Sequence, residues 1–184
     1  ARSGAMTAPA SPPALLELAR SIRAGDTTAE TATERCLAAI GERDGSINAF
    51  IIVMADAARD AARTADRELA SGRDRGPLHG VPMSIKDILE IAGLPTTAAS
   101  RVRRNHVAAR DATVVARLRE AGAVFVGKTN LHEFALGTTN EESAYGPVHH
   151  PLDPTRSPGG SSGGSAASIL AGMAFASMGT DTGG

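Results

Sequence analysis

A strand–helix–strand pattern in the middle of the chain most constrains its fold. Residues 81–86, Val-Pro-Met-Ser-Ile-Lys, are expected to form a short strand. A helix is expected from Asp111 or Thr113 to a stop at Gly122, and residues 123–126, Ala-Val-Phe-Val, are typical of a buried strand. Two strands joined through a helix favour a right-handed parallel crossover. The sequence therefore predicts an α/β protein built on a central sheet.

Further helices and strands are expected on either side of this unit. Three helices precede it: from the Ser11-Pro12-Pro13 opening to a stop at Gly25, from Thr28 to Ile40, and over residues 55–70. Short strands are expected at residues 49–53 and 175–178. The three helices are interpreted as packing elements, and no chemistry is assigned to them.

The beginning of the chain is set apart from the domain. Residues 1–12 are interpreted as a tag or disordered segment, because the stretch before Met6 resembles vector-derived sequence and has no hydrophobic signal core. Residues 13–184 contain no internal repeat and no clear domain boundary. We therefore assign residues 13–184 to a single domain.

Composition excludes several classes of function. The formal net charge of −1 gives no basic footprint for direct nucleic-acid binding. No apolar run reaches the length that spans a membrane. The single cysteine, Cys36, rules out an internal disulfide and is expected to be a buried thiol of the 28–40 helix. These features fit a cytoplasmic protein.

Residues 157–165, Ser-Pro-Gly-Gly-Ser-Ser-Gly-Gly-Ser, concentrate four glycines and four serines. A flexible linker would use the same residue types. However, the sequence Ala-Ala-Ser-Ile-Leu-Ala follows at once from residue 166 and indicates a buried helix. We therefore expect the loop at a helix N-terminus, where free N–H groups and the positive end of the helix dipole face whatever the loop holds.

This loop, with Arg156 before it and residues 179–184, Gly-Thr-Asp-Thr-Gly-Gly, after it, resembles the amidase signature family. The resemblance runs from about Pro13 onward and covers the first part of a family member, since these enzymes are much longer. It implies a mixed, largely central sheet covered by helices on both faces, incomplete in this chain. It also implies that residues 13–184 are the N-terminal part of a domain that continues beyond residue 184, and that neither metal nor cofactor is used.

The resemblance assigns catalytic roles to Lys86 and Ser161. Family members hydrolyse amides with a serine–cis-serine–lysine triad; Lys86 matches the base, and Ser161 matches the bridging serine, with a cis peptide bond to Gly160. A surface lysine in a salt bridge is the alternative for Lys86. A lysine acts as a base only when it is neutral, which requires burial or nearby positive charge to lower its pKa.

The resemblance also places an oxyanion hole at the end of the chain, formed by backbone N–H groups of Thr182, Gly183 and Gly184. The family's nucleophile is the serine immediately after the matched Thr-Gly-Gly. It is therefore expected just after Gly184, and the 184-residue chain without it is expected to be inactive.

Supporting roles are expected for neighbours of these residues. Asp181 is expected to hold its loop by hydrogen bonds, and Gly160 and Ser162 to support the serine loop. Ser162 and Ser165 are interpreted as loop hydroxyls or a helix cap. Residues 134–137 match a family segment that lines the substrate pocket.

A phosphate-binding motif competes with this interpretation. Residues 122–129, Gly-Ala-Val-Phe-Val-Gly-Lys-Thr, match the P-loop pattern. A P-loop needs a glycine-rich turn between a strand and a following helix, whereas here the middle of the motif is the expected strand and the helix precedes it. We reject nucleotide binding and interpret Lys128 as a structural residue at the strand end.

Two other motifs fail on their context. Residues 159–163 match the Gly-x-Ser-x-Gly nucleophile elbow, but three prolines in residues 150–158 argue against the strand that must precede it. The pair His132-Glu133 lacks the second histidine of a metalloprotease motif, and His149-His150 is interpreted as a solvated loop. No metal site is expected.

The sequence therefore predicts the N-terminal portion of a hydrolase that cleaves the C–N bond of a small-molecule amide. One alternative is the glutaminase subunit of a tRNA-dependent amidotransferase, which requires partner subunits. The His149-His150-Pro151 tripeptide replaces the Arg-Asn-Pro common in that subunit, which favours a free-standing hydrolase, for which a homo-oligomer is left open. A non-catalytic fragment or binding module is the alternative of another class.

Overall fold

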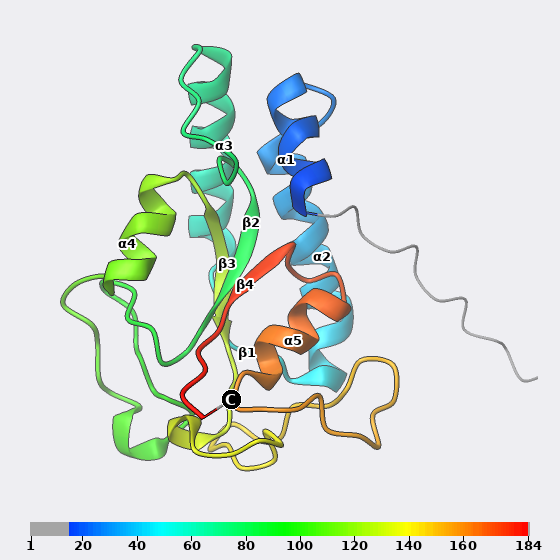
Figure 1. The fold of residues 1–184 in the computed structure, drawn as a ribbon, viewed down its shortest axis with the longest axis vertical. Helices are drawn as coiled ribbons and strands as arrows, with labels where there is room; N and C mark the ends of the chain where they lie inside the picture. Colours follow the sequence, from blue (N-terminus) through cyan, green and yellow to red (C-terminus); the bar gives the residue numbers. More distant parts are fainter. Residues whose placement is uncertain (1–14, 184) are drawn as a thin grey trace, which may run out of the picture.

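The computed structural model describes residues 15–183. Within them, one sheet has the strand order β1-β3-β2-β4 (Figure 1). The strands are β1 (Phe50–Val53), β2 (Pro82–Lys86), β3 (Val124–Thr129) and β4 (Ala176–Met178). β2 runs parallel to both β3 and β4, while β1 is antiparallel to β3. The expected mixed α/β fold and the parallel β2–β3 crossover are confirmed.

The helices lie close to their expected positions. They are α1 (Leu15–Ala24), α2 (Ala29–Ile47), α3 (Ala55–Ala70), α4 (Thr113–Glu120) and α5 (Gly163–Leu170), with short 3-10 helices at Arg101–Arg103 and Glu133–Ala135. The expected Ser11-Pro12-Pro13 opening lies outside the described residues. No helix within 15–183 is long and apolar enough to cross a membrane.

Helix α2 is longer than the sequence indicated. We expected it to end at Ile40, but it extends through Gly41 and Gly45, although glycine costs a helix interior about 1 kcal/mol relative to alanine. The helix continues because Ile47 is buried in the core, and it ends at Asn48, whose left-handed backbone (φ 59°) caps it. Tertiary packing overrides local propensity here.

Helices cover both faces of the sheet, as expected (Figure 1). On one face, Val124 and Val126 of β3 pack with apolar residues of α2, α3 and α5. On the other, Met83, Ile85 and Phe125 pack with residues of α4 and its flanking loops. Cys36 is buried in the first of these clusters, and burial raises the pKa of its thiol to about 12, as suits an inert structural cysteine.

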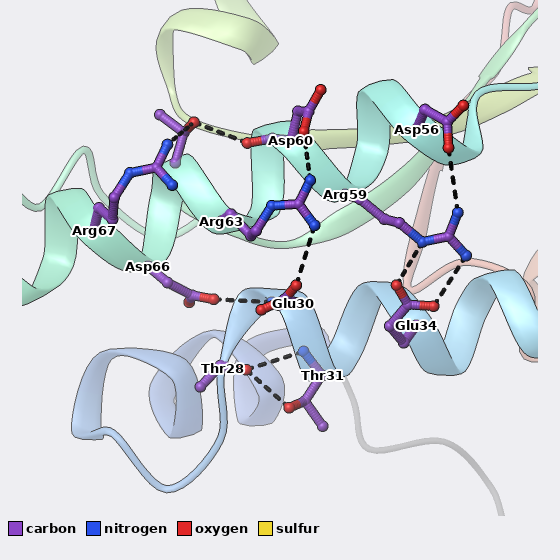
Figure 2. A network of polar contacts seen from close by, with 11 residues as sticks. Thr28, Glu30, Thr31, Glu34, Asp56, Arg59, Asp60, Arg63, Asp66 and Arg67 are labelled. Carbon is purple, nitrogen blue, oxygen red and sulfur yellow. Dashed lines mark hydrogen bonds and ion pairs between the residues drawn. The ribbon is translucent and has the colours of Figure 1, made fainter.

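Polar contacts join α2 to α3 along their exposed sides (Figure 2). Arg59 pairs with Glu34 at 2.6 Å, and Arg63 pairs with Glu30 at 3.3 Å. The Asp66 carboxylate accepts hydrogen bonds from the first two N–H groups of α2, those of Ala29 and Glu30. These contacts fix the helix pair and cap α2 in addition to the N-cap residue Thr28, whose hydroxyl accepts from Thr31 N.

A β-bulge decides where two lysines point. β2 and β3 pair Met83 with Phe125 and then Ser84 with Gly127, so β3 contains one extra residue at this point. Compared with a strand paired without a bulge, one extra residue moves all later side chains of that strand to the opposite face of the sheet. After the bulge, Lys128 pairs with Ile85 and Thr129 pairs with Lys86. Lys86, the last residue of β2, and Lys128, the residue before the end of β3, therefore point to opposite faces of the sheet.

Candidate active site

Lys86, the last residue of β2, lies at the carboxyl edge of the parallel strands with its side chain fully buried. Its Nζ lies 2.7 Å from Ser161 Oγ, 2.8 Å from Ser162 Oγ and 2.8 Å from Thr180 Oγ1. The alternative of a surface lysine in a salt bridge is wrong, because the amine is enclosed and its near partners are three hydroxyl groups.

The fold brings these three segments together for simple reasons. Ile85 pairs with Met178 in the parallel β2–β4 ladder, so Thr180 follows β4 on the same edge at which Lys86 ends β2. Ser161 and Ser162 immediately precede α5, which confirms the expected loop at a helix N-terminus. Helix α5 can approach the backbone of Ala49 and Asn130 closely because Gly164 has no side chain. A Cβ at this position would come within 2.5 Å of the backbone oxygens of both residues.

The peptide bond between Gly160 and Ser161 is cis, and Ser161 Oγ lies within hydrogen-bond distance of the Lys86 amine. Both features were expected from the resemblance. The backbone oxygen of Ser161 accepts a hydrogen bond from His132 N at 3.0 Å, which ties the serine loop to the segment after β3.

The two serines differ in how their protons are used. Ser162 Oγ donates to Thr180 O at 3.1 Å and accepts from Thr180 N at 3.3 Å, so it can only accept from Lys86. Within the described residues, Lys86 is the one hydrogen-bond partner of Ser161 Oγ. A neutral Lys86 amine can thus donate its two protons to Ser162 and Thr180 and turn its lone pair to the Ser161 hydroxyl.

The surroundings of Lys86 favour that neutral form. Burial lowers the pKa of its amine to about 8, and the Asp181 carboxylate partly opposes this shift. Helix α5 has no charged side chain that could stabilise the ammonium form. The arrangement can therefore move the Ser161 proton near neutral pH.

The segment after β4 is described up to Gly183. Gly183 N donates to Asp181 Oδ1 at 3.2 Å, a contact within this loop. Thr182 and Gly183 are exposed, and Gly184 lies outside the described residues. The oxyanion role of residues 182–184 and the substrate contacts of residues 134–137 stay predictions.

Sequence reasoning missed two residues beside the site and left two roles, loop hydroxyl or helix cap, open for a third. Thr180 was passed over, although its position just after a parallel strand could have indicated it. Asn140 is fully buried, and its Oδ1 accepts from Gly163 N at 3.0 Å. Ser162 stands at the N-cap position of α5, but its hydroxyl makes no cap bond and contacts Lys86 instead; Ser165 bonds to Thr129.

The structure confirms the backbone context on which the P-loop pattern and the nucleophile elbow were rejected. Residues 124–129 are a fully buried strand preceded by α4, so the P-loop pattern has no phosphate-binding turn. The residues directly before 159–163, from 151 to 158, form turns and irregular backbone rather than a strand. In the part of the chain that the structure describes, no group of three or more His, Cys, Asp or Glu side chains is placed to hold a metal ion.

Comparison with known families decides the classification. Residues 31–184 match the family model described as Amidase. The chain belongs to the Amidase family. Among curated relatives it is 52% identical over 170 residues to a glutamyl-tRNA(Gln) amidotransferase subunit from Anaeromyxobacter sp. (strain K), covering 92% of this chain and 35% of the relative. The corresponding subunit of Thermobifida fusca is 50% identical over 168 residues, covering 91% and 34%. The chain thus spans about a third of the length of the amidase relatives it matches.

Solved structures of amidases have the same arrangement. One described as an amidase superposes with a TM-score of 0.86 at 42% identity, covering 92% of this chain and 39% of its own. The peptide amidase of Stenotrophomonas maltophilia gives 0.82 at 37% identity, covering 89% and 35%. The glutamyl-tRNA(Gln) amidotransferase subunit of Thermotoga maritima gives 0.64 at 38% identity, covering 81% and 30%.

Proposed function

We propose that this chain supplies the base and the proton relay of a serine–cis-serine–lysine amide hydrolase. The observation that carries the proposal is the contact between a buried Lys86 amine and a Ser161 hydroxyl that has no other described hydrogen-bond partner. Lys86 accepts the Ser161 proton while Ser161 accepts the proton of the attacking hydroxyl. The same protons then return through Ser161 to the leaving nitrogen.

The attacking group in this proposal is a serine just after Gly184, expected from the family pattern. It adds to the amide carbonyl carbon, and the N–H groups of residues 182–184 stabilise the oxyanion. Loss of the protonated amine or ammonia leaves an acyl-enzyme, which water hydrolyses with the same base and relay. No metal or cofactor takes part in these steps.

A second candidate is a glutaminase subunit that passes ammonia to partner subunits. The observation that favours it is the 52% identity to a glutamyl-tRNA(Gln) amidotransferase subunit. Residues 149–151, His-His-Pro, favour the free-standing enzyme. Both candidates share the amide cleavage at Lys86 and Ser161 and differ in the substrate and in where the ammonia goes.

Ammonia release by the full-length protein tests both candidates. The substrates are L-glutamine, L-asparagine, propionamide, benzamide and a C-terminally amidated dipeptide, each assayed with and without the other amidotransferase subunits and glutamyl-tRNA(Gln). Turnover by the protein alone supports a free-standing hydrolase, and glutamine turnover raised by the partner subunits supports the amidotransferase candidate. Absence of ammonia release in every combination contradicts the proposal. A polypeptide that ends at Gly184 is the matched control and is expected to be inactive.

A further inference from the structure

The use of lysine in this chain is restricted to two places. The sequence contains seventeen arginines and two lysines, Lys86 and Lys128. Both lysines are fully buried at the carboxyl edge of neighbouring strands, whereas every arginine in residues 15–183 is at least partly exposed. Lysine carries its charge on a compact ammonium group, unlike the planar guanidinium of arginine. Burial of a charged group is costly unless the group is paired, so the burial of the second lysine, Lys128, needs a physical explanation.

Lys128 is held by three oxygen atoms on the face of the sheet opposite to Lys86. Its Nζ lies 2.6 Å from Asp87 Oδ1 and donates to Pro95 O at 2.6 Å and to Thr96 Oγ1 at 2.7 Å. Burial lowers the pKa of Lys128, and the adjacent Asp87 carboxylate opposes that shift. Three acceptors match the three protons of an ammonium group.

Asp87 connects this ammonium to the residue beside it, Lys86. Its second carboxylate oxygen accepts hydrogen bonds from Thr97 N, at 3.0 Å, and from the Thr97 hydroxyl. Its backbone oxygen accepts from Ala98 N at 2.9 Å. The Lys128–Asp87 pair therefore fixes residues 95–98 against the ends of β2 and β3.

These fixed residues support the loop that carries Ser161. The carbonyl of Ala98 accepts from Phe134 N at 2.9 Å, and the carbonyl of Ala99 accepts from Ala144 N at 2.8 Å. The segment between these two donors includes Asn140, whose side chain accepts from Gly163 N at the start of α5. Hydrogen bonds and the backbone of residues 134–144 thus connect the ion pair to the start of α5, next to Ser161.

An unpaired carboxylate at position 87 would work against the base. It would favour the ammonium form of Lys86, whereas proton abstraction from Ser161 needs the neutral amine. The elements around the Lys86 amine contribute these other titratable groups: Asp181 after β4, and His132, Glu133, Glu141 and Glu142 after β3. Of these groups, the Asp181 carboxylate acts on the pKa of Lys86, and a buried cation, Lys128, pairs with the Asp87 carboxylate that follows Lys86 in sequence.

We propose that Lys128 is a positioning residue for the proposed base: its ammonium neutralises Asp87 and ties it to residues 95–97, so that Lys86 meets Ser161 as a neutral amine. This inference rests on the proposed function. It gives a role to the Gly-Lys-Thr segment that resembles a P-loop without binding phosphate.

The test is the pH dependence of kcat/KM of the full-length enzyme on the amide of the panel that it cleaves best. Lys128→Met removes the cation and is expected to move the acid limb of the profile up by about one pH unit. Asp87→Asn leaves the cation unpaired and is expected to move the limb down by about one unit. The double variant Lys128→Met/Asp87→Asn is expected to return the limb to its wild-type position. Its kcat/KM is expected to be no lower than that of the less active single variant.

Two further variants separate charge from stability. Lys128→Arg keeps the charge, so its limb is expected at the wild-type position even where kcat falls. Glu68→Gln removes the charge of the Glu68 carboxylate, which lies 3.1 Å from buried His79 Nε2 at the opposite end of the sheet, and is expected to leave the limb unchanged. If Lys128→Met does not fold, two variants still test the proposal: Asp87→Asn is expected to lower the limb by about one unit, and Lys128→Arg is expected to leave it unchanged.

The proposal is overturned if Lys128→Met and Asp87→Asn, both folded, keep the wild-type limb, since a structural pair lowers only the amount of active enzyme. It is also overturned if the double variant is shifted as far as either single one. Full activity of Lys86→Ala has a different meaning: it would remove the proposed function, and with it the base that Lys128 serves.

Discussion

Two polar networks in this molecule use similar contacts in opposite surroundings. Between α2 and α3, the arginine–glutamate pairs of Figure 2 have side chains that are 36–46% exposed. At the carboxyl edge of the sheet, Lys86, Asp87 and Lys128 are fully buried. Water and salt screen exposed pairs, so that they contribute little, whereas removal of one partner of a buried pair leaves an unpaired charge. Single atoms should therefore matter at the edge and hardly at all between the helices.

The largest effect is expected from Lys86→Ala in the full-length enzyme. Loss of the base should lower kcat by roughly 10³-fold or more, because proton transfer from Ser161 has no other acceptor in the described site. The far-ultraviolet circular dichroism spectrum should stay unchanged. Wild-type turnover by this variant would contradict the mechanism.

Ser161→Ala and Ser162→Ala sharpen the comparison within the edge itself. Ser161→Ala removes the relay and should lower kcat by roughly 10²-fold or more. Ser162→Ala removes one acceptor of Lys86, and the effect should be about tenfold or less, since Thr180 Oγ1 still holds the amine. Steady-state kinetics of the two variants measure the difference, and the reverse order would assign the relay to Ser162.

The smallest effect is expected from Arg59→Ala on the α2–α3 surface. Glu34 has its pKa lowered chiefly by its hydrogen bond to Arg59, so the pair stabilises the fold above the ordinary pKa of the carboxyl group. That contribution is lost as the pH falls through the lowered pKa. Thermal unfolding at neutral pH should give a melting temperature slightly below that of wild type, and high salt should remove this difference. The value of kcat/KM should stay within about twofold of wild type. A large loss of activity would break the contrast between the two networks.

The contact at the centre of the candidate site could be predicted from the sequence because it joins a short motif to a strand end. The expected contact of Lys86 with Ser161 and the cis bond at Gly160 are both present. The strand–helix–strand pattern of residues 81–126 also predicted the parallel pairing of β2 with β3 correctly, because each of its elements can be recognised from a short run of neighbouring residues. These predictions depended on residues close to one another in the sequence or on a family pattern.

What could not be predicted depends on tertiary register. A bulge of one residue in β3 places Lys128 on the face opposite Lys86, and the residue types around it do not predict this bulge. The cap that Asp66 gives to α2 crosses 37 sequence positions to Ala29. The place of Thr180 beside Lys86 follows from the β2–β4 ladder rather than from its own residue type.

The pH profile of kcat/KM for the full-length enzyme tests the central claim most directly. Burial of Lys86 lowers its pKa to about 8, and the base acts when it is neutral, so activity should rise with pH along an acid limb with an apparent pKa of about 8. Below that pKa the ammonium form predominates and kcat/KM should fall about tenfold per pH unit. A flat profile between about pH 6 and 9, or a limb near the ordinary lysine pKa of about 10.4, would contradict the assignment of Lys86 as the base.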